Sequence, residues 1–85
     1  MRDDLKKIEG IGPKVSELLY ADGIYTFADL ANAPLARVKT ILEKAGSRYK
    51  MIIPDSWAEQ AGLARDGKWD ELDDLQDRLD GGKYV

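Results

Sequence analysis

The sequence of 85 residues contains no cysteine and no histidine. Without cysteine the chain can form no disulfide bond and offers no thiolate to a metal, which suits a cytoplasmic protein. Without histidine it lacks the commonest general base and metal ligand. No apolar run approaches the roughly 20 residues of a membrane span, and no apolar signal-peptide core follows residues 1–4. We therefore expect a cytoplasmic protein that is not an enzyme, with no membrane partner, no metal and no cofactor.

The charge is unevenly distributed along a composition typical of one folded domain, with 44% hydrophobic and 34% charged residues. Residues 1–50 hold nine Lys/Arg and seven Asp/Glu, a net charge of +2, whereas residues 51–85 hold four and nine, a net charge of −5. The weakly basic half is compatible with a nucleic-acid partner. Two merely solvated faces would explain the same pattern equally well.

The most informative stretch is a glycine turn, Glu9-Gly10-Ile11-Gly12-Pro13-Lys14, between two short amphipathic segments. Apolar residues at helical spacing flank it, namely Leu5 and Ile8 before the turn and Val15, Leu18 and Leu19 after it. The glycines allow another backbone or a ligand to come close, and proline suits the first turn of a helix. The free amides at that helix start favour a phosphate, and Lys14 adds a positive charge.

The turn and its flanks resemble the helix-hairpin-helix motif of nucleic-acid-binding proteins, tightly over residues 4–23 and more loosely to residue 46. The resemblance implies that Gly10, Ile11, Gly12 and the following helix start hold a phosphate backbone without reading bases. Glu9 departs from the family, in which many members carry proline there, and its carboxylate would repel a nearby phosphate. The alternative is a tight turn that only packs two helices together.

A second, degenerate copy of the hairpin follows at an offset of 23 residues, because residues 14–23 align without gaps on residues 37–46. A short helical hairpin cannot bury its apolar face alone, and two packed copies can. Lys14 and Arg37 occupy equivalent positions, and a pseudo-twofold axis would direct them at opposite strands of a duplex. Residues 33–36, at the second turn, contain no glycine, so a phosphate would approach it less closely.

Local signals predict six helices. The first spans residues 3–8, the second 13–22, and the third begins after Thr26, which forms a capping box with Asp29. The fourth follows Pro34 and buries one face, Leu35, Val38, Leu42 and Ala45. Residues 47–53 read as an extended linker. A capping box of Ser56 and Glu59 starts the fifth helix, and the sixth runs from about residue 68 or 69 to 80. The residues of these two helices that are expected to face inward are Trp57, Ala61, Ala64, Trp69, Leu72, Leu75 and Leu79.

The predicted fold is all-α: a tandem helix-hairpin-helix (SAM-like) core at 1–46, a linker at 47–53, and a helical hairpin at 54–80 packed on the core as part of one domain. The last two helices are similar in pattern to small bacterial domains in which such a core continues into a tryptophan-containing helical hairpin. Those domains occur alone or as extensions of other proteins, including ribosomal and predicted nuclease-like chains. Residues 83–85 are expected to form a frayed tail.

The predicted function is weak, sequence-independent binding to the phosphate backbone of nucleic acid, with DNA favoured and RNA not excluded. The predicted contact residues are Gly10, Ile11, Gly12, Lys14, Arg37, Lys39, Arg48 and Lys50. The alternative is a protein-interaction or assembly module, with a host, ribosomal or nuclease-like protein as partner, that kept the fold without the binding. Glu9 and the acidic second half favour this alternative. The acidic residues of the last helix follow solvent spacing, so they predict a solvated face and not a metal site.

Overall fold

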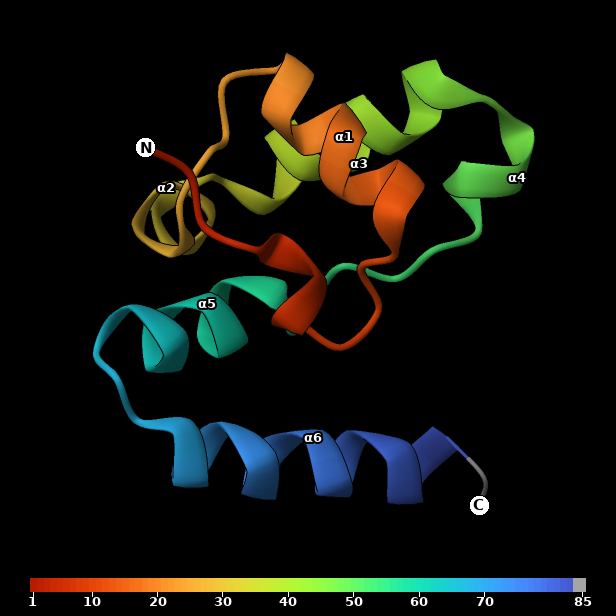
Figure 1. The fold of residues 1–85 in the computed structure, drawn as a ribbon. Coiled ribbons are helices and arrows are strands. Elements are labelled where there is room, and N and C mark those ends of the chain that lie inside the picture. The colour runs from red at the N-terminus through yellow and green to blue at the C-terminus, as the bar shows by residue number, and fades with distance from the viewer. Residues whose placement is uncertain (84–85) are drawn as a thin grey trace.

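The computed structural model describes the backbone of residues 1–83 and the side chains of residues 1–79. Over this range the fold is all-α, with six α-helices, one short 3₁₀ helix and no strand (Figure 1). This confirms the predicted fold class. The elements are η1 (Leu5–Lys7), α1 (Pro13–Ala21), α2 (Phe27–Asn32), α3 (Leu35–Ala45), α4 (Ser47–Lys50), α5 (Trp57–Arg65) and α6 (Trp69–Lys83).

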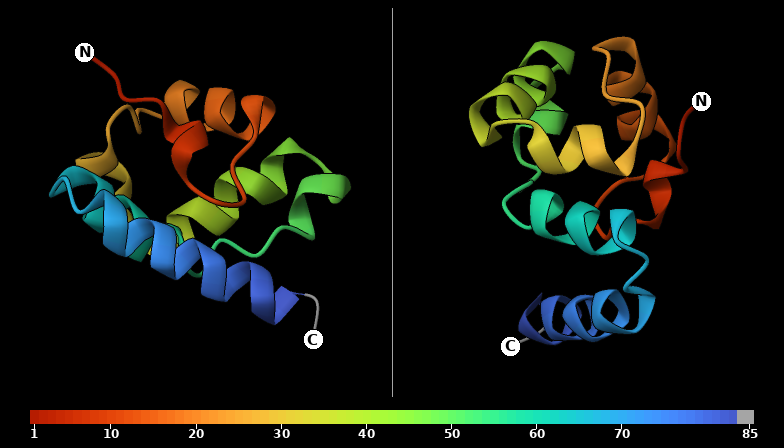
Figure 2. Two further views of the ribbon diagram at one scale, coloured as in Figure 1. Left: turned by 60° about the horizontal axis from the view of Figure 1, so that its bottom comes forward. Right: turned by 90° about the vertical axis from the view of Figure 1, so that its left-hand side faces the viewer.

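The helices are stacked so that α5 lies between the N-terminal helices and α6. Figure 2 shows this best in its right-hand view, where α1 and α3 lie above α5 and α6 lies below it. The most extensive contact between two elements joins α2 to α5, and α1 packs against α3. The buried core therefore runs from the first hairpin through α2 to the inner faces of α5 and α6, and includes Leu5, Ile8, Leu19, Ile24, Leu30, Leu42, Trp57 and Leu72.

The first predicted helix is shorter than expected. Only residues 5–7 form a 3₁₀ turn, capped by the Asp4 carboxylate, which accepts from the N–H of Lys6 at 3.2 Å. Ile8 is already extended (φ −84°, ψ 127°) and leads the chain into the glycine turn. The apolar pair Leu5 and Ile8 is nevertheless fully buried, as its spacing predicted.

Helix α1 begins and ends at the predicted signals. Pro13 is its first residue, and Gly23 follows its end with φ +89°. The N–H of Ile24 donates to the carbonyl of Leu19 at 2.9 Å, and that of Gly23 to Tyr20 at 3.0 Å. These two bonds form a Schellman motif, which satisfies carbonyls left free at a helix end.

The capping box at the start of α2 is confirmed. The Thr26 hydroxyl accepts from the N–H of Asp29 at 3.0 Å, and the Asp29 carboxylate accepts in return from the N–H groups of Tyr25 and Thr26. These hydrogen bonds, with that from Tyr25 the strongest, hold the pKa of the Asp29 carboxyl below its ordinary value.

The inner face of α3 differs from the prediction at both ends of the helix, because Leu35 is exposed and Ala45 is only half-buried. Val38 and Leu42 are buried, whereas Leu35 is 42% exposed and Ile41 is buried instead. Leu35 is the first residue of α3.

The segment predicted as an extended linker contains a helical turn, so that prediction is corrected. Gly46 (φ +133°) ends α3, and α4 then forms a single turn over residues 47–50. The N–H groups of Tyr49 and Lys50 donate to the carbonyl of Gly46 at 3.1 and 3.3 Å. These local hydrogen bonds fix residues 47–50 as a helical turn. The pair of β-branched residues that favours an extended chain begins only at Ile52.

Three further predictions about the C-terminal helices are wrong. Ser56 makes no side-chain cap at α5, because its hydroxyl accepts from Gln60 Nε2 at 3.1 Å instead. Trp69 is 44% exposed, since it stands at the first residue of α6 and packs only edge-on against Phe27, with ring centroids 6.0 Å apart. Helix α6 also continues past residue 80 to Lys83. Of the predicted frayed tail, residues 84–85 lie outside the described range. Trp57, in contrast, is core as predicted, with 2% exposure.

Candidate nucleic-acid interface

The inner side of the glycine turn is packed against the protein. Gly10 has φ +101°, and a Cβ built on it would lie 2.8 Å from the indole Nε1 of Trp57. Ile11 is 5% exposed, and its N–H donates to the carbonyl of Ile8 at 3.1 Å. Ile11 therefore faces the core. Gly10 is exposed, but glycine is required there by the backbone conformation and by the indole packed against it.

The outer side of the turn is open. Gly12 is the N-cap residue of α1 in an extended conformation (φ −95°, ψ −175°), and no atom lies within 4 Å of the Cβ position. Within residues 1–83 no backbone or side-chain group accepts from the N–H groups of Gly12, Lys14 or Val15. Three free amide donors thus gather at the positive end of the α1 dipole, an arrangement that suits an anion.

Lys14 supplies a full positive charge at this helix start. Its side chain is exposed, and it forms no ion pair in the part of the chain with described side chains. Lys6 and Arg2 were not among the predicted contacts, yet they line a hollow of about 420 Å³ with Pro13 and Ser16 of the first α1 turn.

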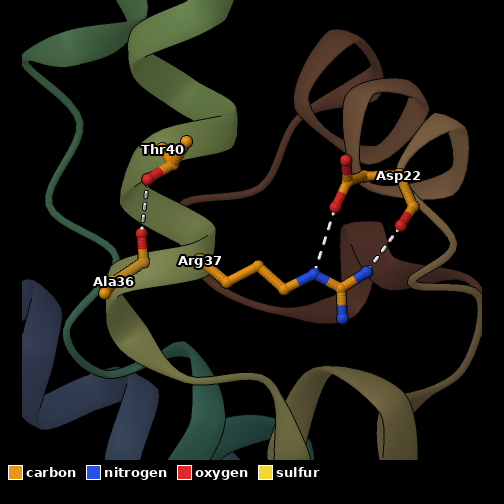
Figure 3. A network of polar contacts seen from close by, with 4 residues as sticks. All are labelled: Asp22, Ala36, Arg37 and Thr40. Carbon is orange, nitrogen blue, oxygen red and sulfur yellow. Dashed lines mark hydrogen bonds and ion pairs between the residues drawn. The ribbon is translucent and has the colours of Figure 1, made fainter.

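Arg37 lies at the other end of α1 from Lys14 and already has a protein partner. Its Nε donates to Asp22 Oδ2 at 3.1 Å, and its Nη2 donates to the Asp22 carbonyl at 2.6 Å (Figure 3). Asp22 follows Lys14 by eight residues, a rise of about 12 Å along a helix. The two basic residues are therefore separated, as a pseudo-twofold pair would be. Arg37 meanwhile binds the C-terminal end of α1, where the dipole favours a cation.

The remaining predicted contacts, Lys39, Arg48 and Lys50, are all exposed. Lys39 and Lys50 come together around a hollow of about 360 Å³, which residues 51–55 also line. Arg48 lies 5.8 Å from the ring centroid of its neighbour Tyr49, which packs partly buried against the core. The structure thus brings Lys39 and Lys50 together and leaves Arg37 apart with Asp22.

Sequence reasoning missed the residue that holds the turn from inside. Gln60 of α5 is 0% exposed and hydrogen-bonds to both the N–H and the carbonyl of Glu9. The only available signal was that Gln60 follows Trp57 by three residues and so shares its buried face.

Two other kinds of site were sought in the described residues. No group of three or more acidic side chains there is placed to hold a metal ion. None of the helices described is long and apolar enough to cross a bilayer.

Two helical hairpins, a glycine turn packed on one side against α5 and an open helix start together define a helix-hairpin-helix domain. The chain belongs to the RS2/RL21/YNQ2 HHH domain family, whose sequence model matches residues 5–65. The family match thus includes the hairpin and α5 and stops before α6.

Three relatives illustrate this membership. The chain is 38% identical over 65 residues to the uncharacterized 22.9 kDa protein in the nqo2 3′ region of Paracoccus denitrificans, covering 76% of this chain and 30% of that protein. It is 44% identical over 62 residues to the large ribosomal subunit protein bL21 of Hyphomonas neptunium, covering 69% and 28%. For bL21 of Jannaschia sp. the identity is 37% over 59 residues, covering 69% and 22%. The chain therefore spans less than a third of these relatives, and no solved structure gave a significant match.

Proposed function

We propose that this domain binds nucleic acid through the phosphate backbone, without sequence preference, at the outer side of the glycine turn. The observation that carries the proposal is the open face of Gly12, where three amides without an acceptor and the exposed Lys14 converge. Backbone amides and lysine contact phosphate oxygens, which are the same for every base, so such binding carries no sequence information.

The other basic residues would extend the contact. Lys39 lies on the surface of α3, and Arg48 and Lys50 lie on the surface of α4. Arg37 uses two of its five N–H donors on Asp22 and could offer the others to a second phosphate. With DNA or RNA duplex as ligand, the chain would act as a binding module and not as an enzyme.

The alternative function is a protein-interaction or assembly module. It is favoured by the exposed apolar side chains of Met51 and Ile53, 83% and 77% exposed, beside the Lys39–Lys50 hollow. The occurrence of the domain in relatives named as large ribosomal subunit proteins is compatible with both functions.

The proposal is tested most directly by Lys14→Glu. The side chain is exposed at the start of α1, so we expect the variant to fold like the wild type. The reversed charge would repel a phosphate at the open amides, and we expect at least about tenfold weaker binding, or about 1.4 kcal/mol. NMR titration of the chain with a short DNA duplex and an RNA duplex of the same sequence, at low salt, measures this.

Lys68→Glu is the matched control, because it makes the same change in net charge in the connection between α5 and α6, on the opposite side of the molecule from the start of α1 (Figure 1). It should weaken binding only slightly, through its long-range field. Equal affinity for the wild type and Lys14→Glu, with both folded, would remove the hairpin as the contact and leave the assembly module as the better function.

A second prediction concerns salt. If two to four phosphates are contacted, the plot of log affinity against log salt concentration should have a slope of about −2 to −4, since each contact contributes roughly −0.9 on B-DNA. Dissociation constants near physiological salt should be micromolar or weaker. Fluorescence anisotropy of a labelled duplex over a salt series gives the slope. A flat response, or strong discrimination between duplex sequences, would contradict binding to the backbone.

A further inference from the structure

A glutamine side chain buried in α5 holds the peptide group that precedes Gly10. Gln60 Oε1 accepts from the N–H of Glu9 at 2.7 Å and from Gln76 Nε2 at 3.0 Å. Gln60 Nε2 donates to the carbonyl of Glu9 at 3.2 Å and to the hydroxyl of Ser56 at 3.1 Å. A glutamine amide has two donor hydrogens and two principal acceptor sites, so this one is fully satisfied at 0% exposure.

The glycine turn is therefore held from one side by α5. Gln60 binds both polar groups of Glu9, and the indole of Trp57, from the same face of α5, lies against Gly10. Residues 12–14 are exposed, and nothing lies within 4 Å of a Cβ built on Gly12. Since the chain is fixed just before Gly12, the direction of the open amides is determined by where α5 places Gln60.

Helix α6 also supports the glycine turn, although it lies outside residues 5–65, which the family model matches. Gln76 Nε2 donates to the Lys7 carbonyl at 2.8 Å as well as to Gln60 Oε1. Both hydrogens of the Gln76 amide are thus used to join η1, α5 and α6 around the peptide of Glu9.

We propose that Gln60 is a positioning residue for nucleic-acid binding: it preorganises the glycine turn so that the N–H groups of Gly12, Lys14 and Val15 face a phosphate before the ligand arrives. The inference rests on the proposed function. Its physical basis is that a turn already in its bound conformation loses less conformational entropy on binding. Without Gln60 the peptide of Glu9 would lack its partners, and the turn would exchange among conformations.

The test is Gln60→Leu, which keeps a side chain of similar size and removes all four hydrogen bonds. We expect about tenfold weaker binding to the short duplex at low salt, or about 1.4 kcal/mol. We also expect the amide of Glu9 to exchange with solvent faster than the change in global stability explains. The matched control is Ala64→Gly, which destabilises the same helix at a buried position away from the turn. At a temperature where both variants are folded, Ala64→Gly should bind like the wild type.

Wild-type affinity of folded Gln60→Leu, or unchanged exchange of the Glu9 amide, would overturn the inference. If Gln60→Leu does not fold, Gln76→Leu removes only the outer hydrogen bonds, and about threefold weaker binding is then expected. Unchanged binding by that variant would likewise count against the inference. Failure of the wild type to bind any duplex would overturn the proposed function instead, and exchange of the Glu9 amide would still decide whether Gln60 holds the turn.

Discussion

Trp57→Ala is expected to lower the free energy of unfolding by about 3–5 kcal/mol, a large part of the stability of a domain this small. The side chain is 2% exposed, belongs to the main core, and its indole supports Gly10 of the turn. Truncation would leave a large cavity between α5 and the first hairpin. Urea denaturation of the wild type and the variant, followed by circular dichroism, measures the difference.

Trp69→Ala is the matched control, since it removes the same side chain from the next helix. Trp69 is 44% exposed and contacts Phe27 edge-on, with the Lys7 ammonium 5.8 Å from its ring centroid. Such aromatic and cation–π contacts contribute about 0.5–1.5 kcal/mol each at most, so the loss should be well below that of Trp57→Ala. A loss below about 1 kcal/mol for Trp57→Ala itself would show that the indole is not core.

The second large effect is expected for Gly10→Ala. A side chain at φ +101° is strained, and the new Cβ would lie 2.8 Å from Trp57 Nε1. Backbone strain of about 1–2 kcal/mol and overpacking of about 1–3 kcal/mol act together, so the variant should be destabilised by roughly 2–5 kcal/mol. Thermal and urea denaturation test this directly.

Gly12→Ala, two residues later, separates folding from binding. Its backbone is extended and the Cβ would meet no atom within 4 Å, so the loss of stability should be limited to the roughly 0.5–1 kcal/mol by which an N-cap prefers glycine to alanine. Under the proposed function the methyl group would stand where a phosphate approaches the amides, and duplex binding should weaken. If Gly10→Ala proves as stable as Gly12→Ala, the packed turn described here is wrong. If Gly12→Ala binds as well as the wild type, a phosphate does not come close at that glycine.

The sequence by itself determined the features whose hydrogen bonds close within a few residues. Pro13 at the start of α1, the end of that helix before Gly23 and the Thr26–Asp29 capping box were all readable, because the hydrogen bonds that fix them join residues three to five apart in the chain. The hairpin repeat and the all-α class followed from the same local periodicity. These signals can be read without knowing which helices pack against each other.

Only the tertiary structure decided which side of the glycine turn is open. The partners of Glu9 and Gly10 are Gln60 and Trp57, about fifty residues away, and no local pattern specifies such a pairing. The same applies to Arg37, whose charge reads as a free ligand in the sequence and is bound to Asp22 in the fold.

The exposed positions of Leu35 and Trp69 have a related cause. Helical spacing indicates which face a residue shares, but burial also depends on whether a neighbouring element covers that end of the helix. Both residues stand at the first position of their helices, where the cover is incomplete, so they remain 42% and 44% exposed. Ser56 likewise has the spacing of a helix cap in the sequence. In the fold its hydroxyl instead accepts a hydrogen bond from the buried side chain of Gln60, which also holds the glycine turn.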